Sequence, residues 1–227
     1  MSYVTLFIVT HSFIFPGFVY AVTPDQTDTA LLLAQVHAAL AGGVRMLQYR
    51  DKISPIAEKL KRARALTALC HEQGAKLIIN DDVVLAIVCG ADGVHLGGTD
   101  GSIRDARRLL PPSCIIGASC YNDVNLAHRA MAEGASYVAF GACFDSPTKP
   151  AARRVTTDQL VAFRAALGST VAICGIGGIT RDNVAHLGTS VDAVALISEL
   201  FGSPAQPASP EQVHDRVQQF LAEPAIA

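Results

Sequence analysis

The sequence lacks a surplus of positive charge. Its 18 lysines and arginines are outnumbered by 20 aspartates and glutamates, so the 227-residue chain carries a formal net charge of −2. Broad nucleic-acid binding usually shows as a basic surface, and this charge balance argues against it. Any cationic site must therefore be local, built from a few basic residues that stand close together.

The chain also lacks cysteines paired as C-x-x-C. Six cysteines are scattered through apolar or glycine-rich segments, namely Cys70, Cys89, Cys114, Cys120, Cys143 and Cys174. This spacing suits neither a zinc site nor a disulfide framework. It is typical of reduced thiols in the cytoplasm, where we expect the protein to reside.

Lysine and arginine are absent from the apolar amino end, MSYVTLFIVTHSFIFPGFVYAVT. A secretory signal needs a basic start and a small-residue cleavage site, and this segment has no clear form of either and contains Pro16. We interpret residues 1–16 as an amino-terminal extension, in keeping with an early start codon, and we expect no membrane attachment.

Apolar, β-branched runs alternate with segments of helical length through the rest of the chain. Strands are predicted at FVYAVT, RMLQYR, KLIIN, DGVHLG, CIIGAS, YVAFGA, VAICG and DAVALIS. Helices are predicted at 29–41, 55–73, 83–89, 102–110, 122–133, 157–167, 181–187 and 210–221. This order predicts an α/β fold, a single (β/α)8 TIM barrel over residues 17–222. A doubly wound open sheet is the alternative, although no G-x-G-x-x-G follows the first strand.

Polar residues gather where the predicted strands end, and a barrel of this kind carries its active site there. The second strand ends in the run QYRDK, in which Gln48, Arg50 and Lys52 occupy every second position. Alternate side chains of a strand share a face, so these three would gather into a local anion site. The other strand ends supply Asn80, Asp81, Asp82, His95, Asp100, Ser119 and the loop FDSPTK.

Each of these residues also has a purely structural explanation. Arg50 and Lys52 could form a solvated strand end. Asp81 and Asp100 could each cap the helix that follows, since aspartate is a favoured N-cap residue. His95 could be a hydrogen-bonded structural histidine, which is the more frequent role for such a residue.

The combination of residues favours chemistry. Two aspartates that end neighbouring strands, Asp81 and Asp100, can hold Mg²⁺ through oxygen and leave room for substrate phosphates. Arg50, Lys52 and Lys149 would meet the same phosphates, arginine through a planar fork of donors and lysine through a point charge. Together these groups predict a site that neutralises a diphosphate.

A second anion site is predicted after the seventh and eighth strands. The seventh strand leads into GIGGIT, with Gly177 and Gly178, and the eighth ends in Ile197 and Ser198. Barrels commonly build a phosphate site from these two loops. Two anion sites, only one with metal ligands, indicate two phosphorylated substrates. One would lose diphosphate, and the other would keep its monophosphate.

The ordered set of motifs resembles the thiamine phosphate synthase family from Val19 to Phe201. The motifs are YAVT, GGVRMLQYRDK, LIINDD, GADGVHLGGTD, IIGASCYN, FGACFDSPTK, CGIGGI and VALIS. The resemblance implies a Mg²⁺-dependent transferase of thiamine biosynthesis. It would couple 4-amino-2-methyl-5-hydroxymethylpyrimidine diphosphate with hydroxyethylthiazole phosphate, giving thiamine monophosphate and diphosphate.

The same resemblance implies roles for individual residues. Catalytic roles fall on Arg50, Lys52, Ser119 and Lys149. The pyrimidine diphosphate would be bound by Gln48, Tyr49, Arg50, Asp51, Lys52, Asn80, Ser119 and Lys149. The thiazole phosphate would be bound by Ser146, Pro147, Thr148, Gly177, Gly178, Ile197 and Ser198. Mg²⁺ would be bound by Asp81 and Asp100.

The chain departs from the family pattern at three positions near these motifs. Gly98 stands where the family often has Gln or Glu, Ser146 replaces a common Thr, and Tyr121 stands where His is frequent. None of these departures removes a residue assigned to the metal or to the diphosphate.

Two other functions fit part of the pattern. A thiazole tautomerase would bind the thiazole phosphate alone and would need an acid/base residue instead of the diphosphate apparatus. A non-catalytic phosphate-binding barrel would account for the glycines but not for paired aspartates with three cations. We therefore expect two phosphorylated small molecules as partners, with no nucleic acid and no membrane. A homo-oligomer is compatible with the sequence.

Overall fold

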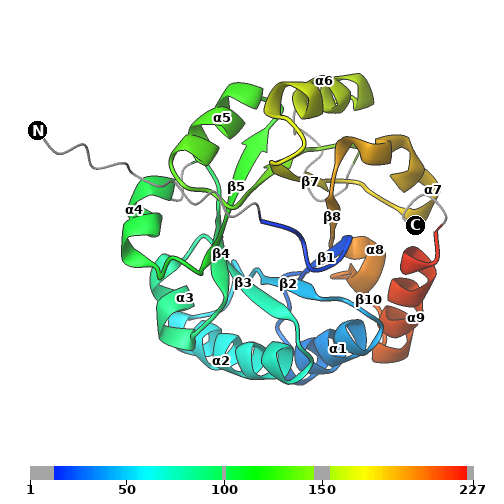
Figure 1. Ribbon diagram of the computed structural model, residues 1–227. Helices are drawn as coiled ribbons and strands as arrows, with labels where there is room; N and C mark the ends of the chain where they lie inside the picture. The colour runs from blue at the N-terminus through cyan, green and yellow to red at the C-terminus, as the bar shows by residue number, and fades with distance from the viewer. Residues whose placement is uncertain (1–12, 99–100, 146–153, 224–227) are drawn as a thin grey trace, which may run out of the picture.

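Eight parallel strands close into a barrel in the computed structural model, which describes residues 13–98, 101–145 and 154–223. The strands are β1 (Val19–Val22), β2 (Met46–Tyr49), β3 (Lys76–Asn80), β4 (Gly93–Leu96), β5 (Ile115–Tyr121), β6 (Tyr137–Phe140), β7 (Ala172–Ile176) and β8 (Ala193–Leu196). They follow one another around the barrel in chain order, and β8 pairs with β1 to close it (Figure 1). The predicted (β/α)8 barrel is confirmed, and the open-sheet alternative is wrong.

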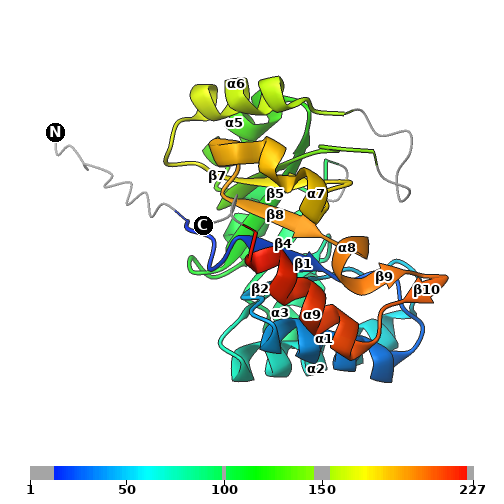
Figure 2. The same cartoon turned by 90° about the vertical axis from the view of Figure 1, so that its right-hand side faces the viewer.

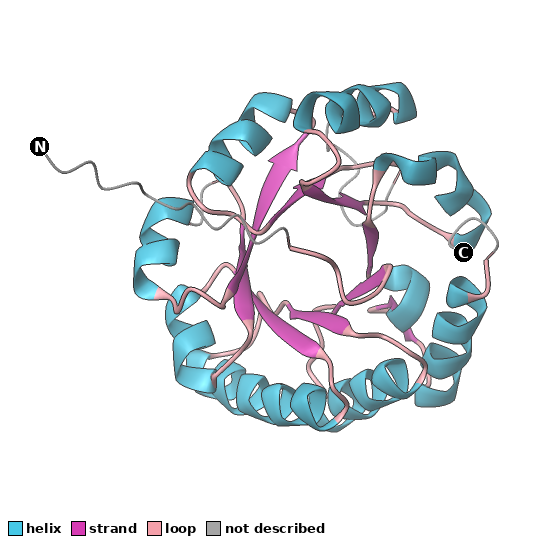
Figure 3. Cartoon of the chain, viewed as in Figure 1, coloured by secondary structure: helices cyan, strands magenta, loops and turns pink. Residues whose placement is uncertain are grey.

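Helices surround the strands on the outside of the barrel (Figure 3). They are α1 (Thr29–Ala41), α2 (Ile56–Glu72), α3 (Val83–Cys89), α4 (Ile103–Leu109), α5 (Val124–Ala132), α6 (Thr157–Leu167), α7 (Arg181–Val184), α8 (Ser198–Phe201) and α9 (Pro210–Leu221). The predicted bounds hold for α1, α3, α6 and α9. The helix predicted at 181–187 is shorter, because α7 ends at Val184 and a 3₁₀ turn (Ala185–Ser190) follows it. In the described part of the chain, no helix combines the length and the apolarity needed to cross a bilayer.

The carboxyl-terminal helix packs against the first helix of the barrel. A short antiparallel pair, β9 (Gly202–Ser203) and β10 (Gln206–Pro207), leads into α9, which then lies beside α1 (Figure 2). Gln35 donates to the carbonyl oxygen of Ala208 at 2.7 Å, and Gln218 donates to that of Gly42 at 2.6 Å. These two hydrogen bonds connect the α1 region near the start of the barrel with the α9 region at its end.

Aromatic side chains fill the barrel interior near the amino-terminal ends of the strands. The ring of Tyr137 lies 5.9 Å from that of Tyr20 on the opposite side of the interior. Phe15 and Phe13 precede β1, and their rings lie 5.0 and 5.7 Å from Tyr137. The last residues of the predicted extension therefore contribute to this core, while residues 1–12 lie outside the described residues.

The six cysteines are all unpaired thiols, and all except the half-buried Cys114 are buried. Burial raises the pKa of Cys120 to about 12 and that of Cys143 to about 11. At neutral pH these thiols are therefore protonated and poorly nucleophilic.

Candidate active site

The loop after β2 is joined to the end of β1 by one threonine. Thr23 is fully buried, and its hydroxyl accepts from the Arg50 amide and donates to the Arg50 carbonyl oxygen, both at 2.9 Å. Since β2 ends at Tyr49, Arg50 and Lys52 are loop residues. The alternation predicted for a strand face therefore does not extend to them, and tertiary contacts place both side chains instead.

Asp25 organises the two cations of this loop. Its Oδ2 accepts from Arg50 Nη1 at 2.7 Å, and its Oδ1 accepts from the Lys52 amide at 2.7 Å. Asp25 follows β1, and sequence reasoning missed it because aspartate after a strand is also an ordinary turn residue. The run TPDQTD after that strand was the signal that would have found it.

Lys52 continues the cluster to the end of β3. Its ammonium forms an ion pair with Asp81 Oδ2, which also accepts from Asn80 Nδ2 at 2.6 Å. Asp81 adopts a left-handed backbone conformation with φ 64°, which aspartate tolerates better than most residues. A hydrogen bond of 2.8 Å from its amide to the His95 carbonyl oxygen supports this conformation.

The helix after β3 is capped by Asp82, not by Asp81. Asp82 Oδ1 accepts from the Leu85 amide at 2.8 Å, so the capping explanation of Asp81 is wrong. The helix α4 is capped by Ser102, whose hydroxyl accepts from the Asp105 amide. The carboxylate of Asp81 is thus directed to the cluster with Lys52.

A cavity of about 410 Å³ opens beside this cluster. Its lining includes Lys52, Asn80 and Asp81, together with Lys59 and Val84. A cation, an amide and a carboxylate therefore face one space at the ends of neighbouring strands.

Asp51 and Tyr49 serve the loop itself. The Tyr49 hydroxyl donates to Asp51 Oδ2 at 2.9 Å, and Asp51 Oδ1 accepts from the amides of Ile53 and Ser54. Burial raises the pKa of Asp51, but the hydrogen bonds from Ser54, Tyr49 and Ile53 outweigh burial and lower it. Both side chains hold the loop in shape, although the resemblance assigns them to substrate.

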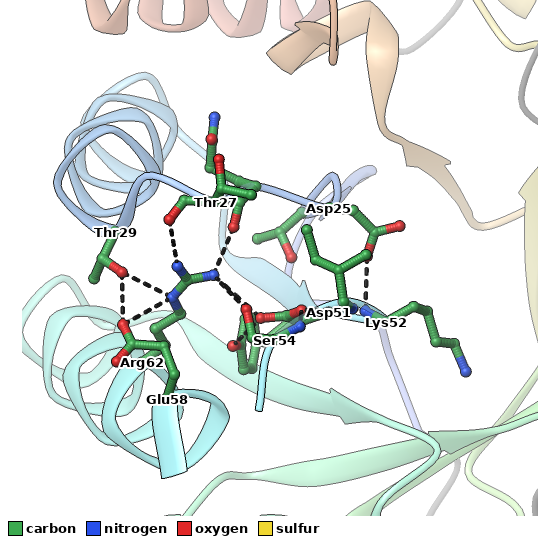
Figure 4. Close-up of polar contacts among 12 residues, drawn as sticks. Asp25, Thr27, Thr29, Asp51, Lys52, Ser54, Glu58 and Arg62 are labelled. Atoms are coloured by element: carbon green, nitrogen blue, oxygen red, sulfur yellow. Dashed lines mark hydrogen bonds and ion pairs between the residues drawn. The ribbon is translucent and has the colours of Figure 1, made fainter. Parts of the chain in front are cut away.

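Arg62 of α2 fastens this loop to the loop after β1 (Figure 4). Its guanidinium bonds to Asp51 Oδ2 at 3.2 Å, and it also donates to the carbonyl oxygens of Gln26 at 2.6 Å and Thr27 at 2.8 Å. Sequence reasoning missed Arg62, because a charged residue within a helical pattern indicates only a solvated face.

Ser119 lies on β5, where His95 of β4 contacts it. His95 Nε2 lies 2.9 Å from Ser119 Oγ, and His95 Nδ1 lies 2.9 Å from the Tyr137 hydroxyl. Burial lowers the pKa of His95 to about 4, so the ring is neutral at physiological pH. His95 thus has the structural role, since both ring nitrogens are engaged, yet its partner is a predicted site residue.

The predicted phosphate loops lie after β7 and β8. Gly177 and Gly178 adopt φ values of 96° and 65°, which favour glycine. A Cβ at Gly178 would come within 2.3 Å of the Asp145 carbonyl oxygen, so the loop after β7 packs tightly on the loop after β6. Ile197 and Ser198 form the junction of β8 and α8.

Five predicted site residues lie outside the described residues, namely Asp100, Ser146, Pro147, Thr148 and Lys149. Within the ranges that the structure describes, no three His, Cys, Asp or Glu side chains converge as a metal site. Asp81 offers a carboxylate of the kind that Mg²⁺ prefers, balanced here by Lys52. At Asp81, the carboxylate oxygens are therefore the type of ligand atom that fits Mg²⁺.

Two of the departures from the family pattern are in contact. The Gly98 amide donates to the Tyr121 hydroxyl at 3.1 Å. A Cβ at Gly98 would lie 3.4 Å from the same ring, so Tyr121 covers the backbone where a larger side chain would stand.

Comparison with known proteins adds a family to this geometry. A family model described as thiamine monophosphate synthase matches residues 19–200. The thiamine-phosphate synthase of Thiobacillus denitrificans is 50% identical over 191 residues, 84% of this chain and 90% of that protein. The thiamine-phosphate synthase of Chromobacterium violaceum is 51% identical over 183 residues, 80% of this chain and 87% of that protein.

A solved structure agrees with these sequence relatives. Thiamine phosphate pyrophosphorylase from Pyrococcus furiosus superimposes with a TM-score of 0.73 at 30% identity, covering 90% of this chain and 96% of that one. The family match over residues 19–200 spans all eight strands and the loops that carry Asp25, Arg50, Lys52 and Asp81.

Proposed function

The chain belongs to the thiamine monophosphate synthase family of transferases, and from this membership we propose its substrates and its chemistry. It couples 4-amino-2-methyl-5-hydroxymethylpyrimidine diphosphate with hydroxyethylthiazole phosphate. The products are thiamine monophosphate and diphosphate.

One observation carries this proposal: the two cations after β2 form a continuous polar cluster with carboxylates that follow β1 and β3. Arg50 pairs with Asp25, Asp25 holds the Lys52 backbone, and the Lys52 side chain reaches Asp81. In a chain of net charge −2, this local concentration of donors is suited to an anionic ligand.

The proposed reaction breaks a carbon–oxygen bond at the pyrimidine methylene. Diphosphate leaves with the bonding electron pair, and the electron-rich aminopyrimidine delocalises the positive charge left on carbon. The thiazole nitrogen then supplies the electron pair of the new carbon–nitrogen bond. Arg50, Lys52 and Lys149 stabilise the negative charge that grows on the departing diphosphate.

Holding two substrates together contributes much of the rate. Placement of two reactants in a productive geometry can lower a barrier by ~7 kcal/mol or more. The loops with Gly177, Gly178, Ile197 and Ser198 hold the thiazole phosphate through backbone amides. No protein nucleophile is needed, in keeping with the raised pKa of the buried Cys120 and Cys143 thiols.

Asp81 and Asp100 are the proposed Mg²⁺ ligands. The ion, when bound, supplies positive charge against the phosphate oxygens. Asp81 is paired with Lys52 in the structure, so Lys52 would exchange this carboxylate for phosphate oxygens as substrate binds. The carboxylate oxygens of Asp81 are the kind of ligand that supports this assignment.

The tautomerase alternative has less support at this site. It needs a residue that takes up and releases protons beside the thiazole ring. His95 lies next to Ser119, but its ring nitrogens are engaged by Ser119 and Tyr137 and it is buried. The cluster around Arg50 and Lys52 would have no purpose in that reaction.

The test supplies purified protein with both substrates and Mg²⁺ and measures thiamine monophosphate. Coupled product supports the proposal. Isomerisation of the thiazole phosphate alone would identify a tautomerase, and binding without turnover would identify a sensor. Chelation of Mg²⁺, or Asp81→Asn, should abolish coupling, and full activity in either case would refute the metal assignment.

Substitutions in the cluster test the diphosphate assignment. Arg50→Ala and Lys149→Ala should each lower turnover about 100-fold or more, as when one donor to a developing negative charge is lost. Arg108→Ala is the matched control, because Arg108 is exposed on α4 and pairs only weakly with Asp105 at 3.4 Å. Wild-type rates in both site variants would contradict the assignment.

A further inference from the structure

A chain of hydrogen bonds crosses the barrel interior between two predicted site residues. Gln48 Nε2 donates to the Tyr20 hydroxyl at 2.9 Å, and that hydroxyl lies 2.9 Å from the Tyr137 hydroxyl. The Tyr137 hydroxyl lies 2.9 Å from His95 Nδ1, and His95 Nε2 lies 2.9 Å from Ser119 Oγ. We name this chain of five side chains, on β2, β1, β6, β4 and β5, the interior relay.

The interior relay is closed to water over most of its length. Tyr20, Tyr137, His95 and Gln48 are all buried. Among the described residues, the ring nitrogens of His95 contact two hydroxyls and no carboxylate, so this buried relay is built from neutral groups. Each hydroxyl then has one proton to donate, and the imidazole has one N–H and one bare nitrogen.

The proton count gives the interior relay a direction. Gln48 Nε2 only donates, so the Tyr20 hydroxyl accepts there. Either hydroxyl of the Tyr20–Tyr137 pair can donate, and donation by Tyr20 is the arrangement in which each hydroxyl both accepts and donates one hydrogen bond. In that arrangement Tyr137 donates to His95 Nδ1, and a neutral imidazole then carries its proton on Nε2.

The two ends of the relay therefore acquire opposite hydrogen-bonding character. With the proton on Nε2, His95 donates to Ser119 Oγ, so the Ser119 hydroxyl keeps its own proton for another acceptor. Gln48 directs its amide nitrogen inward, which leaves its Oε1 to accept. The Gln48 end of the relay thus offers a hydrogen-bond acceptor, and the Ser119 end offers a hydrogen-bond donor.

A glycine makes room for the relay. Gly117 on β5 pairs in register with His95 on one side and with Tyr137 on the other. A Cβ at this position would lie 2.3 Å from the Tyr137 hydroxyl and 2.5 Å from His95 Nδ1. Any side chain at position 117 would collide with the link between these two residues.

We propose that Tyr20, Tyr137 and His95 are positioning residues that fix Ser119 as a hydrogen-bond donor and Gln48 as an acceptor. This pattern is complementary to a heteroaromatic ring that carries both an amino group and a bare ring nitrogen. The proposal rests on the proposed function for the identity of that ring, an aminopyrimidine. It adds that residues which do not touch the substrate set the selectivity for this ring, through their hydrogen bonds to Gln48 and Ser119.

The direction of the relay can be measured without turnover. Protein labelled with ¹⁵N-histidine reports by NMR which ring nitrogen is protonated, and His95→Gln identifies the His95 signals. The expected result is a protonated Nε2 and a bare Nδ1. A protonated Nδ1 would overturn the proposal, because the relay would then run in the opposite direction.

A double-mutant cycle tests whether Tyr137 acts through Ser119. Tyr137→Phe should lower kcat/KM for the pyrimidine substrate about tenfold, the effect of one lost hydrogen bond. In a Ser119→Ala background, the same change should have less than a twofold effect. An equal factor in both backgrounds would show that Tyr137 supports only the fold, and this result would overturn the proposal.

Two further variants keep the test decisive. Ile115→Val removes a methylene from the same interior core at a position paired with Gly93, outside the relay, so it controls for general loosening and should leave kcat/KM near wild type. If Tyr137→Phe does not fold, Tyr20→Phe is compared in the wild-type and Gln48→Ala backgrounds instead. An equal loss of kcat/KM in both backgrounds would again overturn the proposal, now at the Gln48 end of the relay. If wild-type protein forms no thiamine monophosphate, the proposed function fails, and the NMR result still decides the direction of the relay.

Discussion

Replacing Arg62 by alanine should cost this barrel a large part of its stability. The Arg62 side chain is 3% exposed, and so is that of its partner Asp51. Its guanidinium also donates to the Gln26 and Thr27 carbonyl oxygens in the loop after β1. Arg62→Ala would remove these donors and leave a buried carboxylate without its cation.

The magnitude follows from the burial of the pair. Removing one partner of a buried ion pair costs about 3–5 kcal/mol, because the other charge stays buried and uncompensated. A domain of this kind has about 5–15 kcal/mol of stability in total. At about 2–4 °C per kcal/mol for a chain of this length, the melting temperature should fall by roughly 10 °C.

Urea unfolding at fixed protein concentration measures the loss. The midpoint should move to lower urea at an unchanged slope, which indicates lower stability rather than a change in the unfolded state. Arg108→Ala is the control, since Arg108 is 72% exposed and its pair with Asp105 should contribute less than about 1 kcal/mol.

Arg62→Lys separates charge from shape. Lysine keeps the positive charge but lacks the planar fork that reaches two loops at once, so we expect an intermediate loss. A loss below about 1 kcal/mol for Arg62→Ala would refute the reasoning. It would mean that the loops after β1 and β2 keep their positions without the guanidinium.

Two other changes test the barrel interior. Burial lowers the pKa of His95 in the folded protein from 6.5 to about 4. As the pH falls below 6.5, the unfolded chain therefore takes up a proton on this histidine before the folded protein does. The free energy of unfolding should then decrease by about 3 kcal/mol between pH 6.5 and pH 4. Urea unfolding across this range should show a shallower decline in His95→Gln, and an identical decline would contradict the pKa assignment. Gly117→Ala should cost about 1–3 kcal/mol, because its Cβ would lie 2.2 Å from Tyr137 Cζ. Gly17→Ala, whose nearest neighbour is 3.8 Å away, should stay within about 0.5 kcal/mol, and equal losses in the two glycine variants would refute the steric argument.

The barrel was predictable because local signals repeat along the chain. Buried β-branched runs indicated each strand, and the segments of helical length between them indicated the helices. In the structure, Asp28 caps α1 and Ser209 caps α9. The prediction was inaccurate at residues 181–187. There Gly188 takes a φ of 48° and ψ of −139° outside any helix, and the chain forms a 3₁₀ turn.

The candidate site was only partly predictable because its side chains depend on distant partners. Arg50 and Lys52 are conspicuous in the sequence, but Asp25, which orients both, lies 25 or more residues away. Arg62 is indistinguishable by pattern from its charged neighbours in α2. Its burial arises only when the loops after β1 and β2 fold over it, and a helical periodicity does not contain that information.

The pairing of the cations has a consequence for selectivity under the proposed function. Arg50 is held by Asp25 and Lys52 by Asp81, so both side chains are ordered before an anion arrives. A ligand must therefore replace carboxylate contacts rather than merely attract free cations. A monophosphate has few oxygens with which to replace two such pairs, whereas a diphosphate can meet both cations at once. The same carboxylates that order the site thus disfavour the smaller anion, which is a reason for the monophosphate substrate to bind at the loops after β7 and β8.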